Sequence, residues 1–415
     1  MKNEKTKKQE QLYHFFDKLD ASGLVALHYG FRPIETPTIS KQDIASCKAL
    51  KQFDYVENCN CSTATLPLHV EEKAAILRTY FEQLSEVEHP CMVYLKSPTK
   101  GGKDSQRLCE LEIIGSEKAI SEALLIQTSM AILREEGFDN LHVEVNSVGN
   151  KDAIQQFNKE IAIYAKKHAN SLPTDLQQLV KDYPASILNL PDNPFAEMKE
   201  YAPKPSAYLD EPSRMHFQEL LDYLEVMDIP FTISHGLIGN QRYCRETLYE
   251  IIHTKETGER VTCAVGVRYN NLSKLLGFKK DVPVCGVSLL HQRSKMTEVK
   301  NVKVKKPRFI FAHIGPEAKS KSLALIELLR QNHISVYHSL IKDKLGTQLT
   351  TEKPPMGVSN VILMGKLEAV CNAVIVREIA TRKQDTVSVP HLITYLKGLQ
   401  LMGVMVISSN LWLLM

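Results

Sequence analysis

The sequence predicts a mixed α/β protein with a sheet-based core followed by a smaller layered domain. Residues 92–95 and 108–114 are two strand-like runs joined by a polar turn. Residues 208–252 contain a helix, a glycine-containing loop and a strand. From residue 309 onward, strand-like and helix-like segments alternate, which is typical of an α/β layer domain.

The N-terminal part supplies the first elements. Residues from Gln11 to about Gly30 are expected to form a helix, because large apolar side chains recur on one side of it. Residues 66–78 are expected to run from a strand end into a helix. Ser116–Glu136 is predicted as a long helix that ends at Gly137, a residue common just after a helix C-terminus.

The stretch from Tyr208 to Ile252 is the most informative part of the core. Apolar residues repeat at i, i+3, i+4 and i+7 over residues 217–224, which predicts one buried helix face. Pro230 is expected to end this helix. Residues 231–233 and 248–252 are predicted strands on either side of a loop. Such a loop can aim polar groups into a cleft.

The C-terminal part begins after a run of six Lys or Arg residues within residues 295–308, which is expected to be a solvated linker and a domain boundary. Beyond it, strands and helices are predicted in turn. The strands are residues 309–314, 333–338, 358–364 and 373–378, and the helices are residues 316–331 and 390–399.

Composition limits the function classes. The chain has 415 residues, enough for two or three domains, with 43% hydrophobic and 24% charged residues. A net charge of +3 is too mild to indicate nucleic-acid binding by itself. The N-terminus has no apolar signal core, and no run of about 20 apolar residues could span a membrane. We expect a cytoplasmic protein that does not contact a membrane.

Nine cysteines are scattered along the chain, and Cys59 and Cys61 are the only close pair. They lack a second ligand pair at zinc-finger spacing, so no structural metal is expected. Reduced thiols fit the expected cytoplasmic location. The apolar tail at residues 401–415 is too short to span a membrane and is expected to pack on the body or between subunits.

Residues 208–252 resemble the segment of class II histidyl-tRNA synthetases that leads into their histidine-binding signature, Arg-Gly-Leu-Asp-Tyr-Tyr. A gap-free alignment puts Gly239–Cys244 in the place of the signature. Tyr243 agrees with the family, and Gly239 replaces the signature arginine. The resemblance implies that Tyr243 contributes to an amino-acid-binding pocket, and it leaves open whether Arg242 takes over from the missing arginine.

Two N-terminal segments extend the resemblance. Residues 30–37 are similar to motif 1 of class II synthetases, and Pro37 matches its proline, which implies a homodimer. Residues 66–78 resemble a family segment in which Glu71 matches the glutamate that holds the substrate α-amino group. A carboxylate suits an ammonium because a charge-assisted hydrogen bond is strong. Lys73 replaces a family threonine. The alternative is that Glu71 is a solvated glutamate of the first helical turn.

The strand–turn–strand of residues 92–114 resembles motif 2, whose arginines stabilise the ATP α-phosphate. The first-strand arginine position falls at Tyr94 or Leu95. The turn offers Lys96 and Lys103, and Lys103 is the candidate ATP ligand. Lysine can neutralise phosphate but lacks the planar fork of arginine. An ordinary exposed Lys/Gly turn remains the alternative.

Three further residues are candidates through the same resemblance. Glu112 matches a histidine-pocket glutamate. Arg268 is kept from the family's Gly-Gly-Arg-Tyr-Asp motif, which lines that pocket. The segment that resembles motif 3 ends at Arg293, which matches an arginine that contacts ATP, although Leu290 replaces a motif glycine. An arginine of this kind more often forms an ordinary salt bridge.

The resemblance implies a class II aminoacyl-tRNA synthetase-like core with an antiparallel sheet and a C-terminal anticodon-binding-like α/β domain. The expected divisions are residues 1–300 for the core, about 170–210 for a small helical insertion, 301–308 for the basic linker, 309–400 for the anticodon-binding-like domain and 401–415 for the tail.

Three functions are consistent with these residues. The favoured hypothesis is an atypical or degenerate histidyl-tRNA synthetase-like protein that binds histidine or a similar amino acid and has weak or absent ATP-dependent aminoacylation. The second is an active histidine–tRNA ligase that uses ATP and Mg²⁺ and binds tRNA through the C-terminal domain. The third is a regulatory paralogue of the histidine-biosynthesis type. No catalytic residue is assigned. The first is preferred because losing one transition-state charge donor typically costs about 100- to 1,000-fold in rate.

Overall fold

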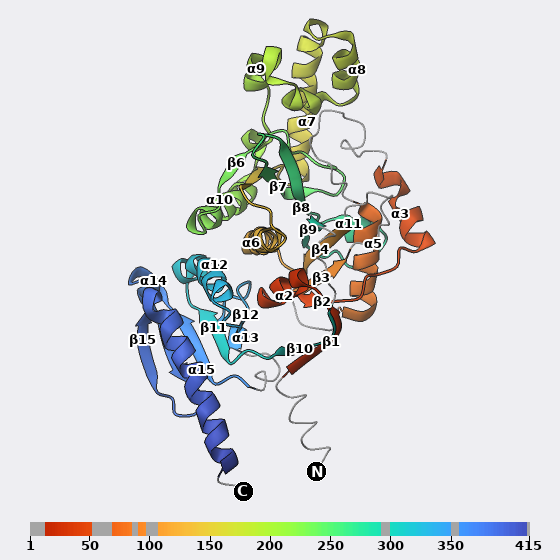
Figure 1. Cartoon of the computed structure of the whole chain (residues 1–415). Helices are drawn as coiled ribbons and strands as arrows, with labels where there is room; N and C mark the ends of the chain where they lie inside the picture. The colour runs from red at the N-terminus through yellow and green to blue at the C-terminus, as the bar shows by residue number, and fades with distance from the viewer. Residues whose placement is uncertain are drawn as a thin grey trace. The chain divides into compact units, whose positions relative to one another are not determined.

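The computed structural model describes residues 13–51, 69–84, 90–96, 107–291, 299–349 and 357–412 (Figure 1). The chain divides into two compact units. The core unit consists of residues 21–26 and 31–296, and the terminal unit consists of residues 1–20, 27–30 and 297–415. No helix in the described part of the chain is long and apolar enough to cross a membrane.

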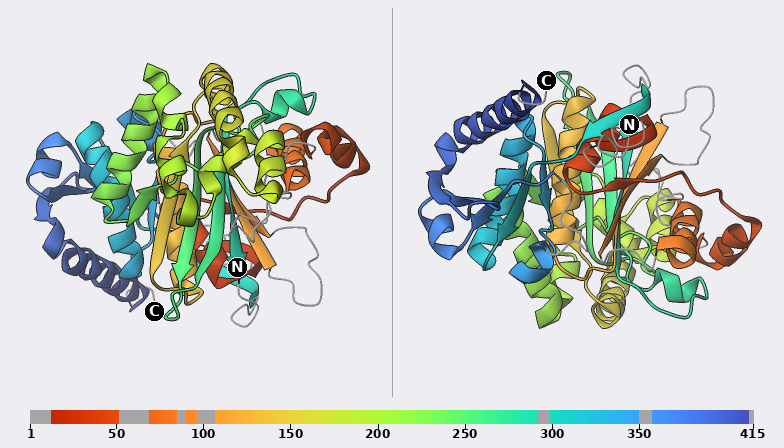
Figure 2. Two further views of the ribbon diagram at one scale, coloured as in Figure 1. Left: turned by 90° about the horizontal axis from the view of Figure 1, so that it is seen from above. Right: turned by 90° about the horizontal axis from the view of Figure 1, so that it is seen from below.

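The core unit is built on an eight-stranded sheet, whose strands lie side by side in Figure 2. In spatial order they are β2 (Arg32–Pro33), β3 (Cys91–Lys96), β4 (Arg107–Ile114), β9 (Val284–His291), β8 (Arg260–Arg268), β7 (Arg245–Thr254), β5 (Leu141–Ser147) and β6 (Phe231–Ile233). Pairing is antiparallel from β3 to β5, and the outer strands β2 and β6 pair in parallel. The predicted antiparallel core is therefore confirmed.

Helices flank the sheet, and those at residues 70–79, 120–135 and 211–226 lie where the sequence predicted helices. They include α3 (Lys41–Lys51), α5 (Val70–Thr79), α6 (Ile120–Glu135), α7 (Lys151–His168), α10 (Glu211–Val226) and α11 (Leu272–Leu275), together with the π-helix η1 (Tyr80–Leu84). Side-chain capping explains where two of these helices begin. The Asn150 side chain accepts hydrogen bonds from the first backbone amides of α7, and Asp210 accepts one from Ser213 at the start of α10.

The segment expected as a small insertion is helical. After α7 it contains η2 (Ala169–Ser171), α8 (Thr174–Asp182), η3 (Pro184–Asn189), α9 (Asp192–Tyr201) and η4 (Pro205–Tyr208). A hydrophobic cluster of buried side chains joins α5, α7 and η3 to the loop before β7. This cluster fixes the loop against the sheet and so positions the residues that replace the family signature.

The terminal unit contains the predicted α/β layer domain. Its five-stranded sheet has the order β12 (Val336–His338), β11 (Phe309–His313), β13 (Asn360–Met364), β14 (Ala373–Glu378) and β15 (Gln384–Ser388). The helices are α12 (Pro316–Gln331), α13 (Leu345–Leu349), α14 (Lys366–Val370) and α15 (Val389–Trp412). Strand β15 was not predicted, because it is polar and largely exposed. Helix α15 extends into the residues expected to be a tail.

One prediction about the ends of the core is wrong. The helix expected from Gln11 to Gly30 is instead strand β1 (Tyr13–Leu19) followed by helix α2 (Ala21–His28). Most of the expected linker is strand β10 (Val299–Lys305), which pairs antiparallel with β1. The two strands are almost 300 residues apart, so no local pattern could show that each supplies the other's backbone hydrogen-bond partners.

Two half-buried histidines, His28 and His338, are expected to make the terminal unit sensitive to acid. The Nε2 atom of His28 lies 3.1 Å from the carbonyl oxygen of Ile326, and the Nε2 atom of His338 lies 3.2 Å from the carbonyl oxygen of His28. Burial lowers the pKa of His28 to about 4 and the pKa of His338 to about 3. Both imidazoles are therefore neutral in the folded chain at pH 7.

We expect the terminal unit to lose stability as the pH falls from about 6.5 to 4. The unfolded histidines take up protons in this range while the folded ones stay neutral, so the stabilisation is present above pH 6.5 and is lost as the pH falls through the folded pKa values. Hydrogen exchange of peptides from β11 and β12 measures this. His338→Asn should flatten the pH dependence, and an unchanged dependence would contradict the assignment.

Candidate functional site

A buried ion-pair cluster lies on the face of the core sheet that is covered by α5. The Nζ atom of Lys73 is 2.5 Å from Glu110 Oε2 and 2.5 Å from Glu112 Oε1. The hydroxyl of Tyr269 donates a hydrogen bond to Glu112 Oε2 at 2.5 Å. All four residues are buried. The chain therefore satisfies much of the hydrogen-bonding capacity of Glu112 with its own side chains.

The strand geometry explains how the cluster forms. Glu110 and Glu112 are two residues apart on β4, so their side chains lie on the same face of the sheet. Gly286 of β9 is directly opposite Glu112, and a Cβ atom there would come within 2.0 Å of Glu112 Oε2. A glycine is needed at this position, because any side chain would displace the carboxylate.

Electrostatics favour the ammonium in this cluster. Burial alone would lower the pKa of Lys73, but the carboxylates of Glu110 and Glu112 raise it above its ordinary value. Burial raises the pKa of Glu110 to about 7, against the opposing effect of Lys73. Among the described residues, Glu110 Oε1 has no hydrogen-bond partner. The cluster thus holds one charged lysine and carboxylates that resist full ionisation.

Glu71 lies in the first turn of α5, two positions before Lys73. It is 8% exposed, so it is not the solvated glutamate of the alternative interpretation. The neighbouring residue Glu72 is 2% exposed, and the charge of Glu72 contributes to the raised pKa of Glu110. Glu71 and Glu112 therefore belong to elements that meet at Lys73.

Arg268 lies on the other face of the sheet. In the strand register Glu112 is opposite Gly286, whereas Arg268 is opposite the preceding residue, Cys285, so the two side chains point to opposite faces. The Arg268 guanidinium donates from Nε to Glu122 Oε1 at 2.6 Å and from Nη2 to Glu122 Oε2 at 2.5 Å.

The Arg268–Glu122 pair has the features of a structural contact. Arg268 is fully buried, and its Nη1 atom also donates to the carbonyl oxygen of Ser116 at 2.7 Å. Despite burial, Arg268 and His216 hold the pKa of Glu122 at about 2. The resemblance implied that Arg268 and Glu112 line one pocket. The structure instead places them on opposite faces of the sheet.

The loop that replaces the family signature is packed and hydrogen-bonded. Gly239 has a φ of 63°, and a Cβ atom there would lie 2.4 Å from Leu248 Cδ2, so glycine is required on both counts. Asn240 Nδ2 donates to the carbonyl oxygen of Leu50 at 2.9 Å. Arg245 Nη1 donates to two loop carbonyl oxygens, those of Gln241 and Cys244, at 2.7 and 2.6 Å.

Tyr243 and Arg242 face different surroundings in this loop. Tyr243 is 2% exposed and belongs to the hydrophobic cluster, so its ring packs in the core. Arg242 is exposed and lines a cavity of about 630 Å³. Of the two, Arg242 is the residue that a small molecule in the cavity could meet.

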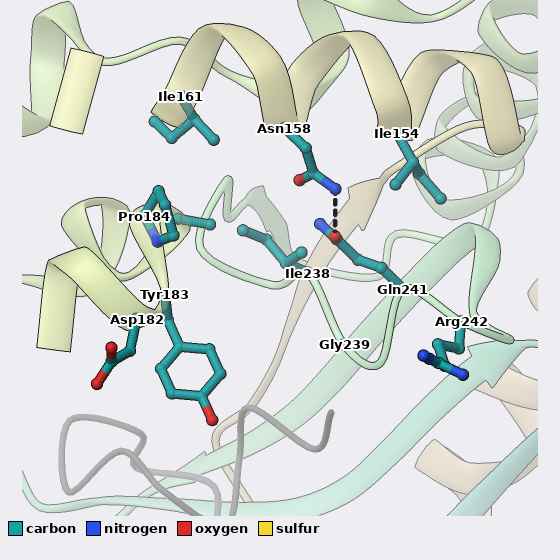
Figure 3. A pocket seen from close by; sticks show the side chains of 11 residues that line it. Ile154, Asn158, Ile161, Asp182, Tyr183, Pro184, Ile238, Gly239, Gln241 and Arg242 are labelled. Carbon is teal, nitrogen blue, oxygen red and sulfur yellow. Dashed lines mark hydrogen bonds between the residues drawn. The ribbon is translucent and has the colours of Figure 1, made fainter. Parts of the chain in front are cut away.

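The cavity lies between α7, the turn after α8 and the loop before β7 (Figure 3). In Figure 3, Asn158 points from α7 toward Gln241, and its Nδ2 atom donates to Gln241 Oε1 at 2.7 Å. Most of the walls are apolar. The lining residues are Ile154, Asn158, Ile161, Asp182, Tyr183, Pro184, Ala185, Ile238, Gly239, Gln241 and Arg242. None of them belongs to the Lys73 cluster, so the candidate site has two separate parts.

Some predictions fall outside the described residues. These are the candidate ATP ligands Arg293 and Lys103 and the close cysteine pair Cys59 and Cys61. Within the described ranges, no group of three or more His, Cys, Asp or Glu residues is arranged to hold a metal ion. The roles of Arg293 and Lys103 in binding ATP stay predictions.

The sequence interpretation missed Glu110. A signal for it was present, because Glu110 and Glu112 alternate within one predicted strand and must share a face of the sheet. Their partner Lys73 could not be identified in this way, since it is 37 residues from Glu110 in the sequence and the docking of α5 depends on tertiary packing.

Comparison with known proteins finds sequence similarity to histidine–tRNA ligases. The histidine–tRNA ligase of Wolbachia pipientis subsp. Culex pipiens is 27% identical over 346 residues, which cover 79% of this chain and 83% of the relative. That of Listeria innocua is 26% identical over 398 residues, covering 91% and 92%. No protein-family model matches the chain. The chain therefore resembles histidyl-tRNA synthetases over most of its length.

Solved structures of similar proteins were also found. The apo histidyl-tRNA synthetase of S. aureus aligns with a TM-score of 0.47 and 19% identity, covering 90% of this chain and 92% of that one. A protein from Bacillus halodurans described as an ATP phosphoribosyltransferase regulatory subunit/histidyl-tRNA synthetase aligns with a TM-score of 0.43 and 14% identity, covering 88% and 95%.

Lys73→Met tests the ion-pair cluster. Removing the ammonium leaves Glu110 and Glu112 buried without their counter-charge, which is expected to cost about 3–5 kcal/mol of stability at pH 8. At pH 5 the cost should be smaller, because the two carboxyl groups can then be protonated. Hydrogen exchange of β4 amides at both pH values measures the change.

The matched control is the triple variant Lys73→Met, Glu110→Gln, Glu112→Gln, which leaves no unpaired charge. It should recover most of the lost stability, because amides are far less costly to bury than unpaired carboxylates. If Lys73→Met alone is as stable as the wild type at pH 8, the cluster is not an ion pair in solution.

Proposed function

We propose that this chain is an atypical histidyl-tRNA synthetase-like protein in which ATP-dependent aminoacylation is weak or absent. The similarity to histidine–tRNA ligases supports the first half of this proposal. The second half is carried by one observation: Glu112, the candidate pocket carboxylate, already binds Lys73 and Tyr269 of the same chain.

The energy of this internal contact sets the expected affinity. A substrate group that binds Glu112 must first displace Lys73 from a fully buried ion pair. Breaking such a pair typically costs about 3–5 kcal/mol, which corresponds to roughly 100- to 5,000-fold in affinity. We therefore expect histidine or a similar amino acid to bind much more weakly than in a site with free carboxylates.

The arginines near the site strengthen the proposal. Adenylate formation places negative charge on the ATP α-phosphate, which arginines stabilise in the family. Here the Arg245 guanidinium donates to loop carbonyl oxygens and the Arg268 guanidinium to Glu122. Neither can bind phosphate without abandoning these contacts. One lost charge donor typically costs about 100- to 1,000-fold in rate. Arg242, beside the cavity, is the loop arginine best placed to compensate.

The remaining parts of the proposal follow from the relatives. The partners would be tRNA, bound through residues 309–400, and histidine or a similar amino acid. ATP and Mg²⁺ would be needed only if adenylate forms. A cytoplasmic homodimer is the expected assembly. The regulatory alternative has less support, because such paralogues commonly lack a C-terminal domain, whereas this chain has a complete five-stranded α/β layer there.

Histidine-dependent pyrophosphate exchange with ATP tests the catalytic half of the proposal. We expect exchange at least about 100-fold below that of an active histidine–tRNA ligase assayed in parallel, because a transition-state arginine is missing. Calorimetry with histidine on the same sample gives the affinity separately. Robust exchange would overturn the proposal in favour of the active ligase, and Arg242→Gln would then show whether Arg242 carries it.

Lys73→Ala tests the internal occupation of the site. Truncation leaves room for a small ammonium beside Glu110 and Glu112, so added methylammonium or histidine should raise the thermal stability of this variant more than that of the wild type. Equal concentrations of sodium chloride serve as the control for salt. Equal shifts in variant and wild type would show that Lys73 does not occupy a cation-binding site.

A further inference from the structure

The strands β1 and β10 form a two-stranded antiparallel ribbon within the terminal unit. In its register Tyr13 lies opposite Lys305, and Phe15 lies opposite Lys303. Residues directly opposite each other in an antiparallel pair, and residues two apart on one strand, point to the same face. These four side chains therefore share one face of the ribbon, with each aromatic ring beside a lysine.

This face is open to solvent. Phe15 is 56% exposed, and Lys303 and Lys305 are exposed. The Nζ atom of Lys303 lies 4.0 Å from the centre of the Tyr13 ring, a cation–π contact. The face thus presents two aromatic rings and two ammonium groups within two rungs of the ladder, with Asp17 as the next residue of β1 on the same face.

The opposite face anchors the ribbon. Its side chains include His14, whose Nε2 atom lies 3.0 Å from the hydroxyl of Tyr337 in β12 of the same unit. Val302 and Val304 on this face are half-buried. The ribbon is therefore held through one face and presents the other face, with Phe15, Lys303 and Lys305, to solvent.

We propose that this aromatic–lysine face binds single-stranded nucleic acid. The exposed Phe15 ring gives a base a surface on which to stack, and the lysines beside the two rings can contact the backbone phosphates. Successive rungs on one face are about 7 Å apart along the strand, so a base stacked on Phe15 lies within reach of Lys303, which already covers the Tyr13 ring. The surface uses no residue of the Lys73 cluster or the cavity, so the proposal holds whether or not the chain forms an adenylate.

An edge-protection role is the competing explanation for the lysines. Lysine on an exposed strand discourages edge-to-edge aggregation. That role does not account for Phe15, because an exposed aromatic ring on the same face would promote aggregation. The pairing of exposed rings with lysines favours a binding surface.

Fluorescence anisotropy of the full chain with a labelled 12-nucleotide oligouridylate tests this proposal. The double variant Lys303→Gln, Lys305→Gln should weaken binding about tenfold or more and reduce the slope of log affinity against log salt by about 1.4, since each lost phosphate contact contributes about 0.7. The matched control is Lys18→Gln, Lys300→Gln. It removes the same charge from the opposite face of the same ribbon and should change affinity less than threefold.

The aromatic contribution has its own variants. Phe15→Ala should weaken binding about 5- to 150-fold, the range expected for one lost base stack, whereas Phe15→Tyr should bind like the wild type. Oligothymidylate compared with oligouridylate shows whether the surface accepts DNA as well as RNA, and binding of either supports the proposal. It is overturned if neither binds at 50 mM salt, if the two lysine pairs have equal effects, or if Phe15→Ala binds normally.

Discussion

The ammonium of Lys73, held between Glu110 and Glu112, is the interaction on which the interpretation of the core unit depends. It joins α5 to the centre of the sheet at a position that is closed to water. A charge in such a place is tolerated only with partners in good geometry. The cluster meets this condition with two carboxylates and the Tyr269 hydroxyl. The polar groups of this face therefore stabilise the fold by binding one another.

The other face of the sheet repeats the arrangement with a different cation. There Arg268 of β8 binds Glu122 of α6 through two hydrogen bonds, and both residues are buried. On each face one helix is thus joined to the sheet through a buried cation, Lys73 with two carboxylates on one face and Arg268 with Glu122 on the other. A substrate pocket needs carboxylates and arginines that are free to meet a ligand, and this core has used several of them to hold its helices in place.

Much of the fold could be predicted from the sequence, because helices and strands with clear periodicity depend on local patterns. Helix α12, for example, begins and ends where its apolar repeat indicates. Strand β1 was mistaken for a helix, because it pairs with β10, which is almost 300 residues away in the sequence. The site was harder for the same reason. The alignment located Glu112 and Arg268, but only the strand register shows that they point to opposite faces.

The ¹⁵N–¹H spectrum of the lysine ammonium groups during a titration with histidine shows most directly whether Lys73 stays paired with Glu110 and Glu112. A buried, ion-paired Lys73 should give a slowly exchanging NH₃⁺ signal that Lys73→Met removes. This signal should stay unchanged at histidine concentrations that saturate an active histidine–tRNA ligase. Loss or displacement of the signal at those concentrations would mean that histidine displaces Lys73 readily and that the ion pair does not close the site.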